Sequence, residues 1–162
     1  MKLVPDFVNG YFEAQGSFDI QFKVAKKEIE VRIIMSIHQG SGSKEIMTSL
    51  ATFFQRDDTY VPTRRKKLVY ETQDRKHHRN VVSVHFNKHP LKSTIHQNFL
   101  KFERALSISE NRRLLTTEEG QRLTKDELRE LVDLSYSMNV QPNINSRYKK
   151  PKEGWLKRID SL

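Results

Sequence analysis

The chain has 162 residues and no cysteine, so its length allows one domain with a sizeable core, and disulfides and thiolate metal sites are excluded. It carries 29 Lys and Arg against 20 Asp and Glu, a formal net charge of +9 that favours a polyanionic partner over an acidic small substrate. No apolar run approaches the ~18 residues of a membrane span, and no signal or transit segment precedes the first predicted helix.

The first predicted helix covers residues 3–15 and leads directly into a strand. Gly10 would let another backbone approach this helix closely. Gly16 stands where a helix C-terminus favours a left-handed residue. Residues 17–25 then alternate strictly between apolar and polar, and residues 29–38 repeat the alternation after a short turn. The pattern predicts a long hairpin with one buried and one polar face.

The rest of the chain predicts further helices around a second hairpin. A helix is expected from Ser43 to about Phe54, followed by strands at 59–72 and 80–87 with residues 74–80 as the tip between them. Another helix opens at residues 89–91. A capping-box pattern at residues 124–127 then predicts a last helix to Met138. We divide the chain into a domain at 1–140 and a basic C-terminal arm at 141–162.

Residues 7–18 read FVNGYFEAQGSF, which resembles the LAGLIDADG motif of the homing endonucleases. With the order αββαββα the resemblance covers about residues 3–138. It implies an α+β fold with a saddle-shaped antiparallel sheet, plus a C-terminal helix and basic tail. Family members with a single motif form homodimers through the motif helix, which implies an interface that includes Phe7, Gly10, Tyr11 and Ala14.

The resemblance also implies that the polar face of the sheet lies along nucleic acid. The composition agrees with this implication, because residues 61–104 hold eleven Lys and Arg against three Asp and Glu. For any one of these side chains, plain exposure to solvent is the alternative. The predicted nucleic-acid-binding residues are Asp19, Gln21, Lys23, Arg32, Ser36, His38, Arg64, Arg65, Lys66, Lys67, Arg75, Lys76 and Arg79.

The catalytic positions depart from the family pattern. Family members hold divalent cations with the second acid of each motif, and here that position is Gln15, an uncharged amide. Glu13 cannot replace it, since two residues are separated by roughly 200° around a helix. Gln39 matches a supporting Gln of the family. A supporting Lys is expected where Ile95 stands, although Lys92 lies nearby.

We therefore expect no functional catalytic residue, no metal and no cofactor. The predicted function is binding of structured RNA, either like a maturase or as part of an organellar ribosome or other ribonucleoprotein, in a mitochondrion or chloroplast. The alternative is a Mg²⁺-dependent homing endonuclease that cuts a long DNA site, with Gln15 a natural or engineered change. Cleavage by some unconventional arrangement is a third possibility.

The C-terminal arm adds a weaker argument for RNA. Tyr148 and Trp155 stand among six Lys and Arg, which combines stackable rings with charge. The alternative is that Trp155 docks onto its own domain.

Overall fold

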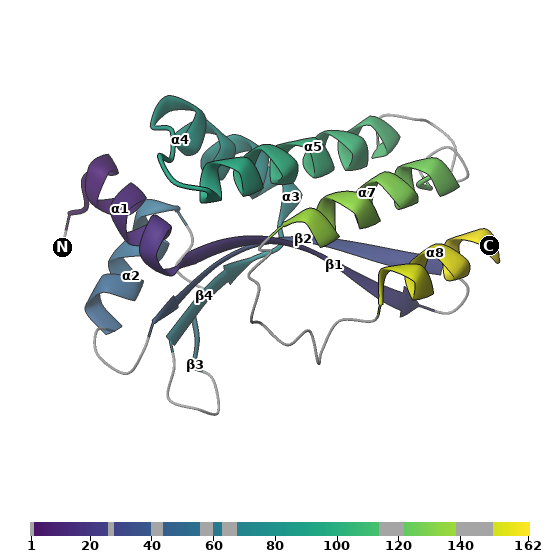
Figure 1. The fold of residues 1–162 in the computed structure, drawn as a ribbon. Coiled ribbons are helices and arrows are strands. Elements are labelled where there is room, and N and C mark those ends of the chain that lie inside the picture. Colours follow the sequence, from purple (N-terminus) through teal and green to yellow (C-terminus); the bar gives the residue numbers. More distant parts are fainter. Residues whose placement is uncertain are drawn as a thin grey trace. The chain divides into compact units, whose positions relative to one another are not determined.

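The computed structural model describes residues 2–25, 28–39, 44–55, 60–62, 68–113, 122–138 and 151–162 (Figure 1). These residues form two compact units. Unit 1 comprises Met1–Phe18 and Ile34–Phe99, and unit 2 comprises Asp19–Ile33 and Leu100–Leu162. The predicted Ser43 start of the second helix and the predicted binding residues Arg64, Arg65, Lys66 and Lys67 lie outside the described residues.

The chain begins with a helix that runs straight into the first strand. The first half of the chain is α1 (Pro5–Gln15), β1 (Gly16–Ala25), β2 (Glu28–Gln39), α2 (Lys44–Phe53), β3 (Tyr60–Pro62) and β4 (Leu68–Thr72). The second half is helical, with α3 (Arg75–His77), the π-helical turn η1 (His78–Val82), α4 (Ser83–Lys88), α5 (Ile95–Arg113), α7 (Lys125–Ser137) and α8 (Lys152–Asp160).

The four strands form one sheet in the order β1-β2-β4-β3. Strands β2 and β4 are antiparallel, with a register that runs from Met35 opposite Thr72 to Gln39 opposite Leu68. Strands β3 and β4 are also antiparallel, and Tyr60 lies opposite Tyr70. The predicted α+β class with an antiparallel sheet is confirmed.

The second predicted hairpin was placed wrongly along the chain. Residues 80–87 are helical rather than extended, and residues 74–80 are the start of that helix rather than a hairpin tip. Val82 and Phe86 are fully buried while Val84, between them, is 58 % exposed. A four-residue spacing fits a helix face as well as an alternating strand, and the N-cap decides: the Asp74 carboxylate accepts from the His77 N–H at 3.1 Å.

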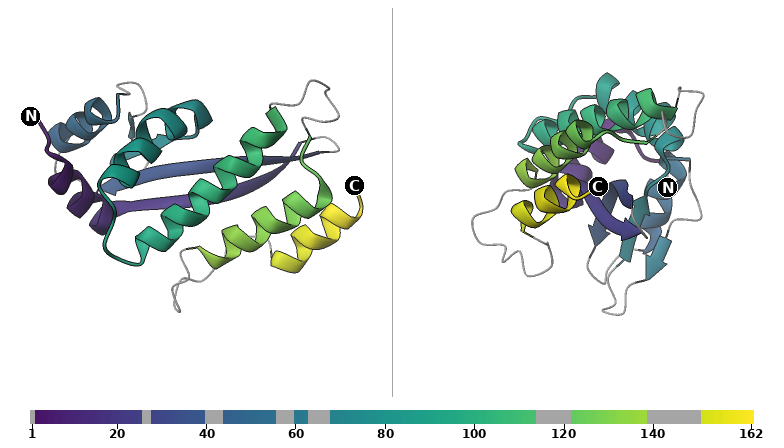
Figure 2. Two further views of the ribbon diagram at one scale, coloured as in Figure 1. Left: turned by 90° about the horizontal axis from the view of Figure 1, so that it is seen from above. Right: turned by 90° about the vertical axis from the view of Figure 1, so that its right-hand side faces the viewer.

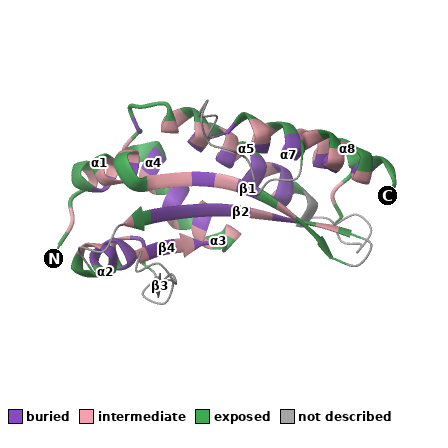
Figure 3. Cartoon of the chain, turned by 60° about the horizontal axis from the view of Figure 1, so that its bottom comes forward, coloured by how far each residue is buried: buried purple, intermediate pink, exposed green. Residues whose placement is uncertain are grey.

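Aromatic rings fill the core of unit 1, and Figure 3 shows where buried residues lie along the chain. Phe12 at the end of α1 is fully buried, with its ring centroid 4.8 Å from those of Phe18 and Phe86. Phe99, from the start of α5, closes the cluster at 5.5 Å from Phe18. This packing fixes the end of α1, where the motif places its chemistry, against β1 and α4.

Gly16 is required by this packing and not by a left-handed backbone. Its φ of −90° and ψ of 159° are extended values that most residues adopt, so the expected left-handed cap is wrong. A Cβ at this position would lie 2.5 Å from two ring carbons of Phe12 and 2.6 Å from the Phe12 carbonyl oxygen. Only a residue without a side chain therefore fits between α1 and β1.

Unit 2 is held together by α7 and α8, which lie side by side in both views of Figure 2. The predicted capping box is confirmed, because the Thr124 side chain accepts from the Glu127 N–H and the Glu127 carboxylate accepts from the Thr124 N–H. The Ser135 hydroxyl on α7 donates to the Ile20 carbonyl of β1 at 2.6 Å. No helix among the described residues is both long and apolar enough to cross a membrane.

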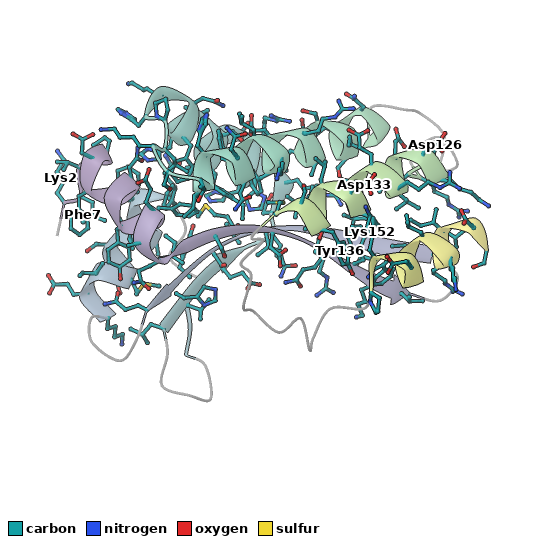
Figure 4. All side chains as sticks on the ribbon, viewed as in Figure 1. Lys2, Phe7, Asp126, Asp133, Tyr136 and Lys152 are labelled. Atoms are coloured by element: carbon teal, nitrogen blue, oxygen red, sulfur yellow. The ribbon has the colours of Figure 1, made fainter. Side chains whose placement is uncertain are left out.

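Helix α8 is formed by residues of the predicted C-terminal arm at 141–162. Trp155 is buried, and its ring centroid lies 5.4 Å from that of Phe22 on β1. The Lys152 ammonium group lies 2.8 Å from the Asp133 carboxylate on α7 (Figure 4). Of the two possibilities for Trp155, the structure has the docked one, so this ring is not available to stack on a base.

Candidate nucleic-acid interface

The position of the missing acid is the exposed last residue of α1. Gln15 ends the helix, and β1 begins at the next residue, so the amide is held at the junction of the two elements. The Gly16 N–H donates to the Phe12 carbonyl and closes the helix there. The side chain at position 15 is thus held at a fixed and exposed junction, but it carries no charge.

The remaining acid of the motif has a structural partner. Glu13 Oε1 accepts hydrogen bonds from the backbone N–H groups of Lys92 and Ser93, the second at 3.2 Å. These residues belong to the segment between α4 and α5 within unit 1. The Glu13 carboxylate therefore holds this segment and compensates two N–H groups that precede a helix.

The other expected remnants are also accounted for by local contacts. The Tyr11 hydroxyl donates to Gln39 Oε1, which ties α1 to the end of β2, and burial raises the pKa of Tyr11. Ile95 is half-buried and is the first residue of α5, so that helix begins four to six residues later than its predicted start at residues 89–91. Lys92 is exposed in the preceding segment.

The polar side of the first hairpin is partly exposed. In unit 2, Gln21 and Lys23 are exposed and Asp19 is half-buried. The Asp19 carboxylate accepts from the Gln21 side-chain amide at 2.9 Å. The Arg32 guanidinium lies 3.1 Å from Glu30. These local bonds orient the side chains, and a polymer bound here would have to replace them.

A row of hydrogen-bonded side chains forms the polar side of the hairpin in unit 1. The Ser36 hydroxyl is 2.9 Å from that of Ser17 and 3.1 Å from Nε2 of His38. Ser36 is only 5 % exposed, so it supports its neighbours, whereas the His38 side chain is exposed. Of the predicted binding residues here, His38 is the one that solvent reaches.

Three of the predicted basic residues lie elsewhere than expected. Arg75, Lys76 and Arg79 belong to α3 and η1, not to the tip of a hairpin. Among the residues that the structure describes, no group of three or more His, Asp or Glu side chains is arranged to hold a metal ion.

The outer side of α1 carries the residues predicted to form the dimer interface. The Phe7 side chain (Figure 4) is 41 % exposed. Its ring stacks on that of Tyr11 with centroids 6.0 Å apart. Ala14 is exposed, and a Cβ added at Gly10 would meet nothing within 4 Å. Val4, at 59 % exposure, extends the same apolar surface and was not predicted.

Asn9 is a residue whose role the sequence analysis missed. Its Oδ1 accepts from Nε2 of His85 at 2.9 Å, and its Nδ2 donates to the His89 carbonyl at 2.8 Å. The signal was an amide within the apolar stripe of a helix, between Val8 and Gly10. Asn9 therefore fixes α1 to α4 and to the segment that follows it.

This contact predicts a pH dependence of stability. Burial, and then the charge of His89, lower the pKa of His85 to about 4. His85 therefore binds a proton more readily in the unfolded chain than in the folded one. Its contribution to the free energy of unfolding is fully present above about pH 6.5 and is lost as the pH falls toward 4. Between pH 7 and pH 5 we expect a loss of about 1 kcal/mol, allowing for solvent screening of a partly exposed ring.

The measurement is urea unfolding of the wild type and of His85→Gln at both pH values. Gln keeps a side-chain N–H for Asn9 but does not titrate in this range, so its loss between pH 7 and pH 5 should be smaller by that amount. Equal losses in the two proteins would show that His85 is not the group responsible.

These features agree with what comparison with known proteins finds. The sequence model of the family described as LAGLIDADG endonuclease matches residues 8–106, well over half of the chain. The chain therefore belongs to the LAGLIDADG endonuclease family. No curated protein matches the sequence significantly.

Several solved structures share the fold. A homing endonuclease, I-TnaI, superposes with a TM-score of 0.78 at 22 % identity over 99 % of both chains. I-GzeII in complex with its DNA target gives 0.74 at 21 % identity, covering 99 % of this chain and 58 % of that one. I-CpaMI bound to uncleaved DNA gives 0.74 at 16 % identity, covering 85 % of this chain and 46 % of that one. The chain thus equals I-TnaI in extent and spans about half of the other two.

Proposed function

We propose that this protein is a homodimeric nucleic-acid-binding member of the family that does not cleave its target. The observation that carries the proposal is Gln15, an exposed amide at the end of α1, where family members present a carboxylate. The net charge of +9 supports a polyanionic partner, and the exposed polar side chains of the first hairpin, such as Lys23 and His38, are available to it.

The residues around this position do not fit Mg²⁺. A hard divalent cation prefers ionised carboxylate oxygens, and Gln15 offers one neutral oxygen. Glu13 is engaged by the N–H groups of Lys92 and Ser93. In a symmetric dimer both copies would lack the acid, so we derive no step through a metal ion.

Structured RNA in an organelle is the finer part of the proposal. A role such as that of a maturase or of a ribonucleoprotein component needs the binding surface and not the nuclease centre. The buried Trp155 no longer supports this choice, so it rests on the loss of the acid. Cleavage of double-stranded DNA is the second candidate, favoured by relatives of this fold whose structures contain DNA.

The test restores the acid and compares it with a matched amide. Gln15→Asp and Gln15→Asn, which are equal in size, are prepared beside the wild type, and the nucleic acid that co-purifies with the wild type is identified. Each protein is incubated with Mg²⁺ and with that nucleic acid or a DNA copy of it. We expect salt-sensitive binding by all three proteins and no cutting by the wild type or by Gln15→Asn.

The outcomes separate the two candidates. Double-strand cutting of DNA by Gln15→Asp alone would favour a DNA endonuclease disabled at one position. Cutting by the wild type would overturn the proposal. Retention of RNA with no cutting by any of the three proteins is the result that the proposal predicts.

A further inference from the structure

One segment of unit 1 contains no acidic residue. Residues 75–99 are all described, and they contain no Asp or Glu. They hold five Lys or Arg residues and five of the six histidines of the chain, namely Arg75, Lys76, Arg79, Lys88 and Lys92 together with His77, His78, His85, His89 and His96. This composition differs from an ordinary soluble surface, where both signs of charge alternate.

A continuous helix presents part of this segment as a straight stripe. Elements α3, η1 and α4 join without a break, since His78 and Ser83 at the junctions have helical φ and ψ. A π-helical turn contains more residues than an α-helical turn, so the average here approaches four residues per turn. Exposed residues accordingly recur every four positions, at Lys76, Asn80, Val84 and Lys88.

Within unit 1, this stripe lies on the opposite side of the sheet from the row of Ser17, Ser36 and His38. Phe86, on the inner side of the helix, packs on Phe18 of β1 with ring centroids 5.7 Å apart. Successive strand residues point to opposite faces, so Ser17 and the row that it forms with Ser36 and His38 face away from this helix. A nucleic-acid segment that binds along His38 therefore lies on one face of the sheet, and the stripe lies over the other face.

The lysines of this surface are available to a ligand. Lys76, Lys88 and Lys92 are exposed, and none forms an ion pair with a described residue. In unit 2, by contrast, Arg104 lies 2.7 Å from Glu130 and Lys152 lies 2.8 Å from Asp133. The basic groups of unit 2 are thus partly neutralised within the chain, and the three lysines are not.

Local contacts also hold the segment that carries the third lysine. The Lys92 N–H donates to Glu13, and the neighbouring His89 carbonyl accepts from Asn9 at 2.8 Å. The Glu13 carboxylate is therefore already engaged with backbone N–H groups. We define the outer basic surface as Lys76, Asn80, Lys88 and Lys92.

We infer that the outer basic surface binds the phosphodiester backbone of a second nucleic-acid segment, separate from the one proposed for the sheet. Lysines without an ion pair to a described residue, together with the Asn80 amide, suit a repeating phosphate charge, which needs positive groups and hydrogen-bond donors rather than a shaped pocket. The inference goes beyond the proposed function, because that function needs only the polar side of the sheet. It would let one protein hold two segments of a folded nucleic acid together.

The natural absence of cysteine allows a site-specific test. Asn80→Cys and Gln21→Cys each receive a photoreactive benzophenone maleimide, one on the outer basic surface and one on the sheet. Each labelled protein is irradiated with a structured RNA hairpin or with a DNA duplex of equal length. We expect crosslinks at both positions, and the two polymers show whether the surface prefers RNA or DNA.

Neutralising the three lysines should then reduce crosslinking from the label at position 80 and not from the label at position 21. In a Lys76→Gln, Lys88→Gln, Lys92→Gln background, crosslinking at position 80 should fall at least about tenfold near 0.15 M salt, with crosslinking at position 21 nearly unchanged. Circular dichroism checks that the variant is folded. The slope of the logarithm of affinity against the logarithm of salt should become shallower by about 2 to 3 for the second segment.

Three outcomes would overturn the inference. The first is crosslinking at position 21 without crosslinking at position 80. The second is crosslinking at position 80 that survives loss of the lysines. The third is displacement of the RNA or DNA from position 80 by polyglutamate as efficiently as by unlabelled nucleic acid, which would indicate an acidic-protein partner. Crosslinking at neither position would instead overturn the proposed function itself.

Discussion

Gly16→Ala is expected to destabilise the protein by about 3 kcal/mol, because it places a methyl group inside a packed core. The added Cβ would lie 2.5 Å from the Cγ and Cδ2 atoms of Phe12. The ring cannot move aside, since Phe12 is fully buried with Phe18 and Phe86 against it. The backbone cannot move either without losing the bond from the Gly16 N–H to the Phe12 carbonyl.

Gly10→Ala is the matched control, with an expected effect of opposite sign. The same methyl group at Gly10 meets nothing within 4 Å and lies within α1, where Ala is favoured over Gly by roughly 0.5–1 kcal/mol. Urea unfolding followed by the fluorescence of Trp155 measures both variants in dilute solution, where a dimer contributes least. A Gly16→Ala protein as stable as the wild type would contradict the close contact.

The two glycines show what the motif could and could not reveal. The sequence predicted that both are special, and it predicted the helix-to-strand junction around Gly16. It assigned Gly16 a left-handed backbone, because a glycine at the end of a helix usually has one. The actual reason is the ring of Phe12, four residues earlier, which is held in place by Phe86 from a distant part of the chain. Such a contact cannot be read from local spacing.

The second hairpin shows a different limit. Val82, Val84 and Phe86 alternate with polar residues, which predicts a strand, yet Val82 and Phe86 are also four apart, which suits a helix. The sequence contained a further signal, because Asp74 is three residues before the N–H group that it caps. Periodicity alone could not decide, and the N-cap could have done so.

The sequence predicted those features of the candidate site that depend only on which residue occupies a position. The loss of charge at Gln15 follows from the motif alone. The partners of Glu13 and Asn9 do not, since Lys92 and His85 are more than seventy residues away along the chain. For the same reason the sequence placed Arg75, Lys76 and Arg79 beside the sheet strands, and only the helix from α3 to α4 shows that they belong to another side of the molecule.

Phe7→Glu is expected to convert a dimer into a monomer. Phe7 is 41 % exposed on the outer side of α1, next to Val4 at 59 % exposure and the open surface at Gly10. Burying a Phe side chain contributes about 1.5–3 kcal/mol, and a two-fold axis would bury it twice. A charge in its place should therefore raise the dissociation constant at least about 100-fold.

Light scattering measures the mass directly, with a chain of 19.1 kDa as the unit. Val24→Glu is the control, because Val24 is 43 % exposed on β1 in unit 2 and its substitution adds the same charge to a residue outside α1. We expect a dimer for the wild type and for Val24→Glu, and a monomer for Phe7→Glu. A dimeric Phe7→Glu protein would place the interface elsewhere, and a monomeric wild type would contradict the proposed symmetric dimer.

The proposed dimer would matter for the chemistry as well as for the mass, because Gln15 ends the same helix that carries Phe7. A symmetric contact through α1 would present two amides where the family presents two acids, so one substitution removes both charges. Phe7→Glu therefore tests the role of α1 in dimerisation, and Gln15→Asp tests its role in cleavage. If the monomeric Phe7→Glu protein binds nucleic acid with a much shallower salt dependence than the wild type, each copy contributes phosphate contacts to one shared target.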